Sequence, residues 1–264
     1  MKRCGFGRMH LVVMTAAGLA APLSGCGQSA PPGDGGEHAG APGEAEIVTL
    51  FPDAAPLPGQ TECKVVIRTG LTVSSAQHVS PCTPVQYATN PPSGGDHWAM
   101  WAAYKSYETP VPREIYVHSL EHGAIVLAYR CPPSGCAEVK ALLEAVRAGA
   151  ASDPRCLVSP GGPEARLVVT RDEALDTPVA AAAWGATYTA TCLDEPSLAR
   201  FVADHYAAGP EDTCSLLGAV DVDDPAGGAP SCGGAADGAA TGGDATGATG
   251  GDAPGATGGG PAGP

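Results

Sequence analysis

Apolar side chains recur in the central part of the chain with spacings typical of strands and helices. Residues 124–129 form a short continuous apolar run, which indicates a buried strand. Between residues 136 and 148, Val139, Leu142, Leu143 and Val146 recur at helical spacing. Similar patterns predict further strands over residues 62–73, 166–170 and 178–191, a helix over 196–207, and a short helix over 96–104.

The order of these elements predicts the fold class. Apart from the short helix, the order is strand, loop, strand, helix, strand, strand, helix, with a loop rich in proline and glycine over residues 81–95. Such an order indicates an α/β or α+β sandwich in which a small sheet packs against two main helices. We therefore predict a single compact domain over residues 47–225, a length that suffices for one hydrophobic core.

Glycine-rich segments flank this domain. Of the 37 glycines in the chain, 21 lie in residues 27–46 and 226–264, where large apolar side chains are scarce. Such segments cannot bury enough apolar surface to offset the entropy lost on ordering. Residues 26–46 are therefore predicted to be a flexible tether, and residues 226–264 a disordered tail.

The N-terminus has the features of a leader for export. Three basic residues precede an apolar stretch over residues 11–23, which is too short to span a bilayer as a helix. The stretch ends in Leu23-Ser24-Gly25-Cys26, a string typical of bacterial lipoprotein signals. We therefore predict a signal peptide over residues 1–25, acylation of the Cys26 thiol, and an exported lipoprotein anchored to a membrane of the cell envelope. The alternative is an ordinary signal peptide in which Cys26 is incidental.

The charge balance restricts the partners. The chain carries 28 acidic and 14 basic residues, a formal net charge of −14. Such a chain repels phosphate backbones, so nucleic acid is a poor partner. The partner that the sequence does predict is a membrane, reached through the acylated Cys26.

Eight cysteines follow the leader and the predicted lipid site. An even number of cysteines in an exported chain predicts disulfides. The candidates are Cys63, Cys82, Cys131, Cys136, Cys156, Cys192, Cys214 and Cys232. The sequence leaves their connectivity open, and near neighbours are the simplest assumption: Cys63–Cys82, Cys131–Cys136, Cys156–Cys192 and Cys214–Cys232. A redox-active pair is disfavoured, because four residues rather than two separate Cys131 from Cys136.

Histidines provide the candidate chemistry. His118 and His122 belong to an H-x-x-E-H string, and residues four apart share a helix face, so both could reach one metal ion. His97 is a candidate third ligand, and Glu121 is a candidate ligand or the group that orients one. Imidazole donors suit copper or zinc rather than calcium or magnesium. His78 stands alone in the sequence and is assigned no role.

Other interpretations of these residues stay open. In one, His118, Glu121 and His122 form a buried polar network in a structural or protein-interaction module, because an imidazole beside a carboxylate satisfies both groups. In another, the protein is a metal-dependent hydrolase with Glu121 as general base. A zinc peptidase is disfavoured, because its inverted motif needs a long helix, whereas Gly123 and the strand-like run after it limit this helix to about one turn.

The loop before His97 is expected to shape the site. Asn90, Pro91 and Pro92 favour an extended backbone, and Ser93 and Gly94 continue it into a glycine-rich turn. A loop of this kind presents the following histidine in a narrow range of directions. The five residues are therefore predicted to position His97.

Two of these strings also carry a family resemblance. Residues 87–98 (YATNPPSGGDHW) and 117–123 (VHSLEHG) resemble the bacterial family called domain of unknown function 3105, DUF3105. Residues 183–185 and 209–211 resemble its C-terminal half, so the resemblance covers roughly residues 65–211. It implies no settled activity, but its members are often secreted or attached to membranes, in agreement with the leader. The sequence thus predicts an envelope lipoprotein that binds copper or zinc and that we do not expect to be an enzyme.

Overall fold

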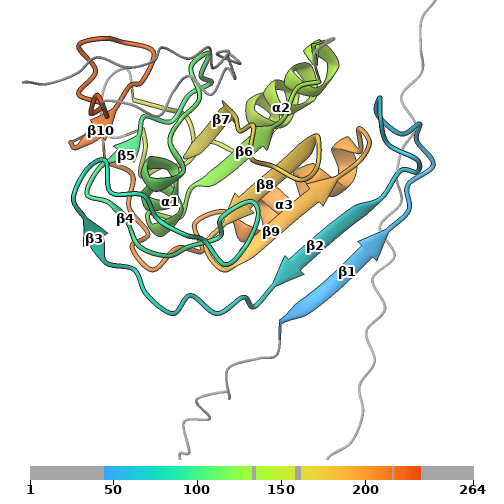
Figure 1. Ribbon diagram of the computed structural model, residues 1–264, viewed down its shortest axis with the longest axis horizontal. Helices are drawn as coiled ribbons and strands as arrows, with labels where there is room; N and C mark the ends of the chain where they lie inside the picture. Colours follow the sequence, from blue (N-terminus) through green and yellow to red (C-terminus); the bar gives the residue numbers. More distant parts are fainter. Residues whose placement is uncertain (1–44, 133–134, 158–161, 216, 233–264) are drawn as a thin grey trace, which may run out of the picture. The chain divides into compact units, whose positions relative to one another are not determined.

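A six-stranded sheet forms the centre of the computed structural model (Figure 1), with its strands in the order β1-β2-β9-β8-β6-β7. The structure describes residues 45–132, 135–157, 162–215 and 217–232. The strands are β1 (Glu46–Leu50), β2 (Val65–Thr69), β6 (Ile125–Tyr129), β7 (Leu167–Arg171), β8 (Val179–Ala183) and β9 (Ala186–Ala190). Neighbouring strands are antiparallel except for β6 and β7, which are parallel. Two parallel pairs lie outside this sheet: β3 (His78–Val79) with β4 (His97–Trp98), and β5 (Trp101–Ala102) with β10 (Ala219–Val220).

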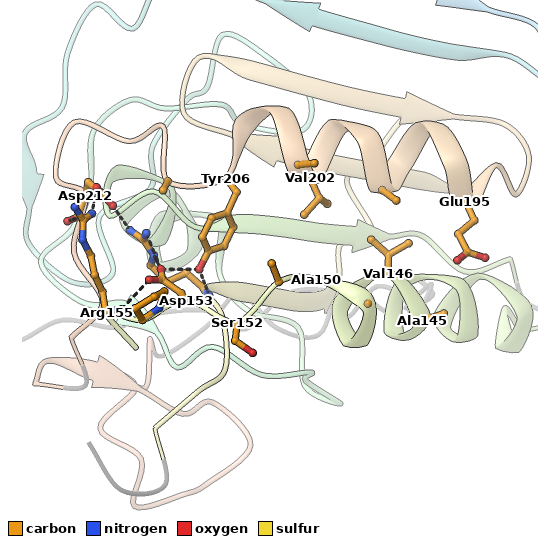
Figure 2. Close-up of a pocket in the computed structure, with 17 residues that line it drawn as sticks. Ala145, Val146, Ala150, Ser152, Asp153, Arg155, Glu195, Val202, Tyr206 and Asp212 are labelled. Atoms are coloured by element: carbon orange, nitrogen blue, oxygen red, sulfur yellow. Dashed lines mark hydrogen bonds and ion pairs between the residues drawn. The ribbon is translucent and has the colours of Figure 1, made fainter. Parts of the chain in front are cut away.

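Three helices occur in the described residues: α1 (Arg113–Glu121), α2 (Ala137–Gly149) and α3 (Glu195–His205). Helix α2 makes the crossover that the parallel strands β6 and β7 require, and it lies beside α3 on one face of the sheet (Figures 1 and 2). Helix α1 packs on the opposite face, against β4, β5 and β6. The fold is thus a mixed α+β fold with a small sheet, as predicted, and it has one helix more than the two main helices expected.

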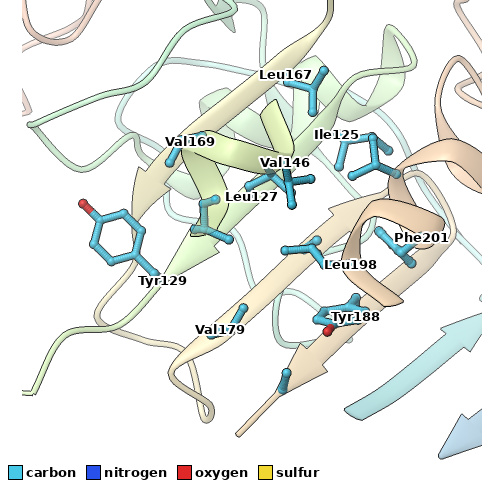
Figure 3. Close-up of a cluster of buried hydrophobic side chains, with 14 of the residues drawn as sticks. Ile125, Leu127, Tyr129, Val146, Leu167, Val169, Val179, Tyr188, Leu198 and Phe201 are labelled. Carbon is cyan, nitrogen blue, oxygen red and sulfur yellow. The ribbon is translucent and has the colours of Figure 1, made fainter. Parts of the chain in front are cut away.

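The sheet is buried on both faces, which explains its continuous apolar strands. Along β6, Ile125 and Leu127 face α2 and α3 (Figure 3), whereas Val126 and Ala128 belong to the core on the α1 side. Successive side chains of a strand point to opposite faces, so a strand covered on both sides needs apolar residues at every position. None of the helices in the described part of the chain is long and apolar enough to cross a membrane.

The predictions for β6, β7, α2 and α3 are confirmed to within two residues, and others need correction. The short helix expected over residues 96–104 is wrong, because this segment forms β4 and β5, whose strand partners are distant in sequence. The single strand expected over residues 178–191 is the hairpin β8–β9, which turns at Gly185 with a φ of +69°. The helix that carries His118 has nine residues rather than one turn.

Four disulfides confirm the prediction from the cysteine count: Cys63–Cys192, Cys82–Cys232, Cys131–Cys136 and Cys156–Cys214. Of the near-neighbour pairs only Cys131–Cys136 is right, and Cys63–Cys82, Cys156–Cys192 and Cys214–Cys232 are wrong. Strand register explains the bond between Cys63 and Cys192. Val65 on β2 pairs with Ala190 on β9, so the cysteines two residues beyond each lie opposite one another. Four disulfides indicate an oxidising, exported environment.

Thiol titration tests these bonds. For a chain that begins at residue 27, denatured without reductant, we expect no more than about one free thiol per molecule, because export favours oxidation of all eight cysteines. The same sample after reduction is the control and should show all eight thiols. About six or more thiols before reduction would contradict the disulfide assignment.

The predicted leader, the lipid site Cys26 and most of the predicted tether and tail lie outside the described residues. Glu46, the last residue of the predicted tether, begins β1. Residues 226–232 of the predicted tail are described, and Cys232 is bonded to Cys82. The domain limits at residues 47 and 225 stay predictions.

Candidate metal centre

Two short strands bring His78 and His97 side by side. The parallel pairing of β3 with β4 places His78 opposite His97, and their ring centroids lie 5.0 Å apart. The Asp96 carboxylate ties the two segments together, because it accepts hydrogen bonds from the Ser75 hydroxyl and from the Gln77 N–H at 2.9 Å. These two hydrogen bonds hold the pKa of Asp96 below its ordinary value, so the carboxylate stays ionised. A histidine that appears isolated in the sequence therefore belongs to the site.

The loop of residues 90–95 fixes the ring of His97. The Ser93 carbonyl accepts a hydrogen bond from the Gly185 N–H at 2.7 Å. Gly94 has a φ of +143°, and a Cβ there would lie 2.6 Å from a Val73 methyl group, so glycine is required. The next carbonyl, that of Gly95, lies 2.8 Å from His97 Nδ1. A carbonyl oxygen only accepts, so Nδ1 carries the proton and the lone pair of the neutral ring is on Nε2.

The other prolines and polar side chains of the loop anchor it to the domain. The peptide bond between Asn90 and Pro91 is cis, and Pro92 and Ser93 are buried. The Asn90 amide donates to the Ala174 carbonyl at 2.8 Å and accepts from the Arg113 guanidinium at 2.8 Å. The loop is therefore attached both to the start of α1 and to the segment after β7.

Helix α1 contributes His118 and Glu121. It starts after Pro112, and Gly123 lies two residues beyond its last residue. The φ of +79° at Gly123 lets its N–H reach the Leu120 carbonyl and the next N–H reach the Ser119 carbonyl, which closes the end of the helix. Because the helix is surrounded by the core, both His118 and Glu121 are buried. His118 Nδ1 donates to the Trp98 carbonyl at 2.8 Å, which leaves its Nε2 free. Burial, assisted by the neighbouring histidines, lowers the pKa of His118 to about 3, so this ring is neutral at physiological pH.

Three imidazoles converge on the Glu121 carboxylate. The Nε2 atoms of His97, His78 and His118 lie 3.0, 3.8 and 3.9 Å from Glu121 Oε2. One ligand atom from each of the four residues lies within 4.8 Å of the other three. His97 is completely buried, whereas the His78 side chain is 50% exposed and forms the solvent side of the group. This His/Glu group could hold a metal ion, and we call it the His/Glu cluster.

The predicted ligand His122 is not part of the His/Glu cluster. Its Nε2 lies 3.3 Å from Glu211 Oε2, and its ring packs against Trp101 at a centroid distance of 4.5 Å. Its Nδ1 is buried and has no hydrogen-bond partner among the described residues. Helical geometry explains the separation, because Glu121 and His122 project to opposite sides of His118. The H-x-x-E-H string thus supplies one imidazole and one carboxylate to the cluster, rather than two imidazoles.

A glycine turn holds Glu211 against His122. The Glu211 N–H donates to the Glu121 carbonyl at 3.0 Å. A Cβ on Gly209 would lie 2.4 Å from that same carbonyl oxygen, so a larger residue would push the turn away from α1. Local spacing in the sequence does not identify Glu211 as a site residue, although residues 209–211 belong to the strings that carry the family resemblance.

His205 lies apart from these groups. It ends α3, and its ring packs against Phe201 at a centroid distance of 4.7 Å, on the other face of the sheet. His205 is therefore a suitable control residue for the histidines of the cluster.

Comparison with known proteins agrees with the motifs at this centre. No curated protein and no solved structure shows significant similarity to the chain. One family does match, described as "Protein of unknown function (DUF3105)", over residues 78–216, which is more than half of the chain. The matched segment starts at His78 and contains all four residues of the His/Glu cluster. The chain therefore belongs to the DUF3105 family.

Proposed function

We propose that this protein is an exported lipoprotein of the cell envelope that binds a Zn²⁺ or copper ion at the His/Glu cluster. One observation carries the proposal: three imidazole Nε2 atoms surround one buried carboxylate oxygen, at 3.0 to 3.9 Å. In neutral rings His97 and His118 each direct a lone pair into this space, because their Nδ1 atoms are used by carbonyl oxygens. Lone pairs that converge in this way are satisfied by a cation placed between them.

The ligand arrangement has the features of a metal site. Histidine ligands usually donate their second ring N–H to a carbonyl or carboxylate, which fixes the tautomer and the ring orientation. The Gly95 and Trp98 carbonyls have this role for His97 and His118. Three imidazoles and a carboxylate suit Zn²⁺ or Cu²⁺, whereas Ca²⁺ and Mg²⁺ prefer oxygen donors. Thiolates are not available in the domain, because its eight cysteines form disulfides.

A structural role for the cluster is the second candidate. It is favoured by the burial of His97 and Glu121 and by their 3.0 Å contact, which joins β4 to α1 without any ion. In that case the cluster is a polar part of the core, and the protein is an interaction module of the envelope.

Elemental analysis of the untagged protein, purified without chelators, separates the two candidates. We expect about one zinc or copper per chain, because the cluster offers one set of converging ligands. For protein stripped with a chelator, addition of the metal at 100 times its Kd should stabilise the fold by about 2.7 kcal/mol, visible as a higher melting temperature. Protein that carries no metal and whose melting temperature does not respond to zinc or copper would leave only the structural role.

The membrane anchor is a separate part of the proposal. Replacement of Cys26 by serine should release the protein from the membrane fraction, because acylation supplies the membrane affinity and the acidic chain would be repelled by anionic lipids. Fractionation in detergent-free, high-salt buffer measures the change, with the wild type as the control. If the Cys26→Ser protein, with its leader removed, still sediments with membranes, the acyl anchor is wrong.

A further inference from the structure

A cavity of about 690 Å³ lies between α2 and α3, on the face of the sheet away from the His/Glu cluster (Figure 2). Both helices line it with small apolar side chains: Ala145 and Val146 from α2, and Ala199, Val202 and Ala203 from α3. Its volume is within the usual range for small-molecule sites, about 300–1,000 Å³. The two helices thus leave between them an apolar space of the size of a small ligand.

One end of the cavity is polar and rigidly built. Arg166, which is only 1% exposed, contacts the Asp153 carboxylate at 2.8 Å and the Asp212 carboxylate at 2.8 Å. The Tyr206 hydroxyl donates to Asp153 at 2.8 Å and accepts from the Arg166 backbone N–H at 2.9 Å (Figure 2). Arg166 also donates to the His122 carbonyl at 2.6 Å, which connects this end to the end of α1. The polar groups are therefore held in place before any ligand arrives.

The charges at this end are balanced. Asp153 is paired with Arg166, and Asp212 is paired with both Arg166 and Arg155. A charged ligand group would have to compete with these pairs, and an anionic one would also meet the Glu195 carboxylate at the opposite end (Figure 2). The cavity therefore favours a neutral ligand.

The hydrogen-bonding groups specify the polar end of the ligand. The Asp212 side chain is 35% exposed, and its carboxylate oxygens have lone pairs beyond those used by the two arginines. Acceptors at the polar end call for a hydrogen-bond donor on the ligand.

We propose that the α2–α3 cavity is a binding site for a neutral, mainly apolar small molecule that carries an O–H or N–H donor at one end. The apolar body lies along the alanines of the two helices, and the donor reaches the Asp212 carboxylate oxygens. The proposal does not depend on metal binding at the His/Glu cluster.

A fluorescence titration with N-phenyl-1-naphthylamine tests the site, because this compound is neutral and apolar and has one N–H group. The wild-type protein should bind it saturably at one site. Two variants fill the cavity from opposite walls: Ala145→Phe on α2 and Ala199→Phe on α3. Each should weaken binding by at least about tenfold, because the added ring occupies the cavity. Both alanines are exposed, so the variants should keep the wild-type melting temperature.

Two controls make the result specific. Ala141 is exposed on α2 one turn before Ala145 and does not line the cavity, so Ala141→Phe should bind like the wild type. The compound 8-anilinonaphthalene-1-sulfonate adds a sulfonate to the same ring system and should bind at least about tenfold more weakly. The proposal is overturned if the wild type does not bind N-phenyl-1-naphthylamine saturably, if both cavity variants bind it like Ala141→Phe, or if the sulfonate binds equally well.

Discussion

Replacement of His118 by alanine is expected to weaken binding of Zn²⁺ or Cu²⁺ by at least about 100-fold. His118 lies at the centre of the site, with its ring 4.7 Å from both His78 and His97, and its Nε2 directed toward Glu121. Loss of one of four ligands removes a metal–nitrogen bond that water replaces only poorly in a buried site. Metal affinity is measured by competition with a chelator of known strength, and His97→Ala should give a loss of similar size.

The matched control for this prediction is His122→Ala. His122 is one helical turn from His118 and almost equally buried, and its ring lies 4.6 Å from the His118 ring. Its Nε2 is directed to Glu211, however, and His122 is not one of the four residues whose ligand atoms converge. We therefore expect the His122 variant to keep most of its metal, and His205→Ala to keep all of it. Equal losses from His118→Ala and His122→Ala would instead support the simple interpretation of the H-x-x-E-H string, in which both histidines bind one ion.

The same variants also distinguish metal binding from a structural role. If the cluster is only a polar part of the core, His118→Ala lowers the stability of the metal-free protein by about 1–3 kcal/mol, because the Trp98 carbonyl loses its partner. In that case the wild type and the variant respond equally to added metal. Melting curves with and without zinc or copper, recorded on both proteins, give the answer.

Replacement of Arg166 by methionine is expected to destabilise the fold by about 3–5 kcal/mol. The Arg166 guanidinium is buried, and its removal leaves the Asp153 carboxylate and the His122 carbonyl without their main partner. Denaturant unfolding of the metal-free protein measures the loss. The control is Arg200→Met on α3. Its guanidinium is exposed and, within the described part of the chain, pairs only with Asp204 on the next turn, so its removal should leave stability unchanged within error.

The pH dependence of stability checks the Arg166 prediction. Burial by itself raises the pKa of Asp153. This effect is outweighed by hydrogen bonds from the Arg155 backbone N–H and the Tyr206 hydroxyl and by the positive charge of Arg166, so the pKa of Asp153 lies below its ordinary value. A carboxylate with a lowered pKa in the folded state contributes stability above its unfolded pKa of about 3.9 and loses it as the pH falls further. The wild type should therefore lose stability below about pH 4 more steeply than Arg166→Met. Equal slopes would show that Arg166 does not stabilise the ionised form of Asp153.

Much of the fold could be predicted from local pattern. The apolar run of β6 and the helical spacing of apolar residues in α2 can be read from the sequence, because buried positions are occupied by apolar side chains. Segments with short-range patterns but long-range partners were harder to predict. Trp98 and Trp101 have helical spacing, yet β4 and β5 pair with strands that lie 19 residues earlier and 118 residues later.

In the candidate site, too, some contacts follow from local spacing and others depend on pairing between segments far apart in sequence. His118 and Glu121 share a short string on one helix, so their proximity follows from helical geometry. His78 has no such signal in its own segment. It reaches the cluster only because β3 pairs with β4 and because Asp96 holds the residues before His78 in place.

The sequence by itself determined the buried segments that form β6, β7, α2 and α3, the number of disulfides and the family, because each depends on composition or on residues close together in the chain. The leader and the lipid site are its predictions. The tertiary structure alone decided how the six cysteines other than Cys131 and Cys136 pair, which histidines meet and what lies between α2 and α3. The register of β2 with β9 selects Cys192 as the partner of Cys63. The rotation of α1 sends Glu121 into the His/Glu cluster and His122 toward Glu211. These choices depend on contacts between segments far apart in sequence, and no local spacing of residues encodes them.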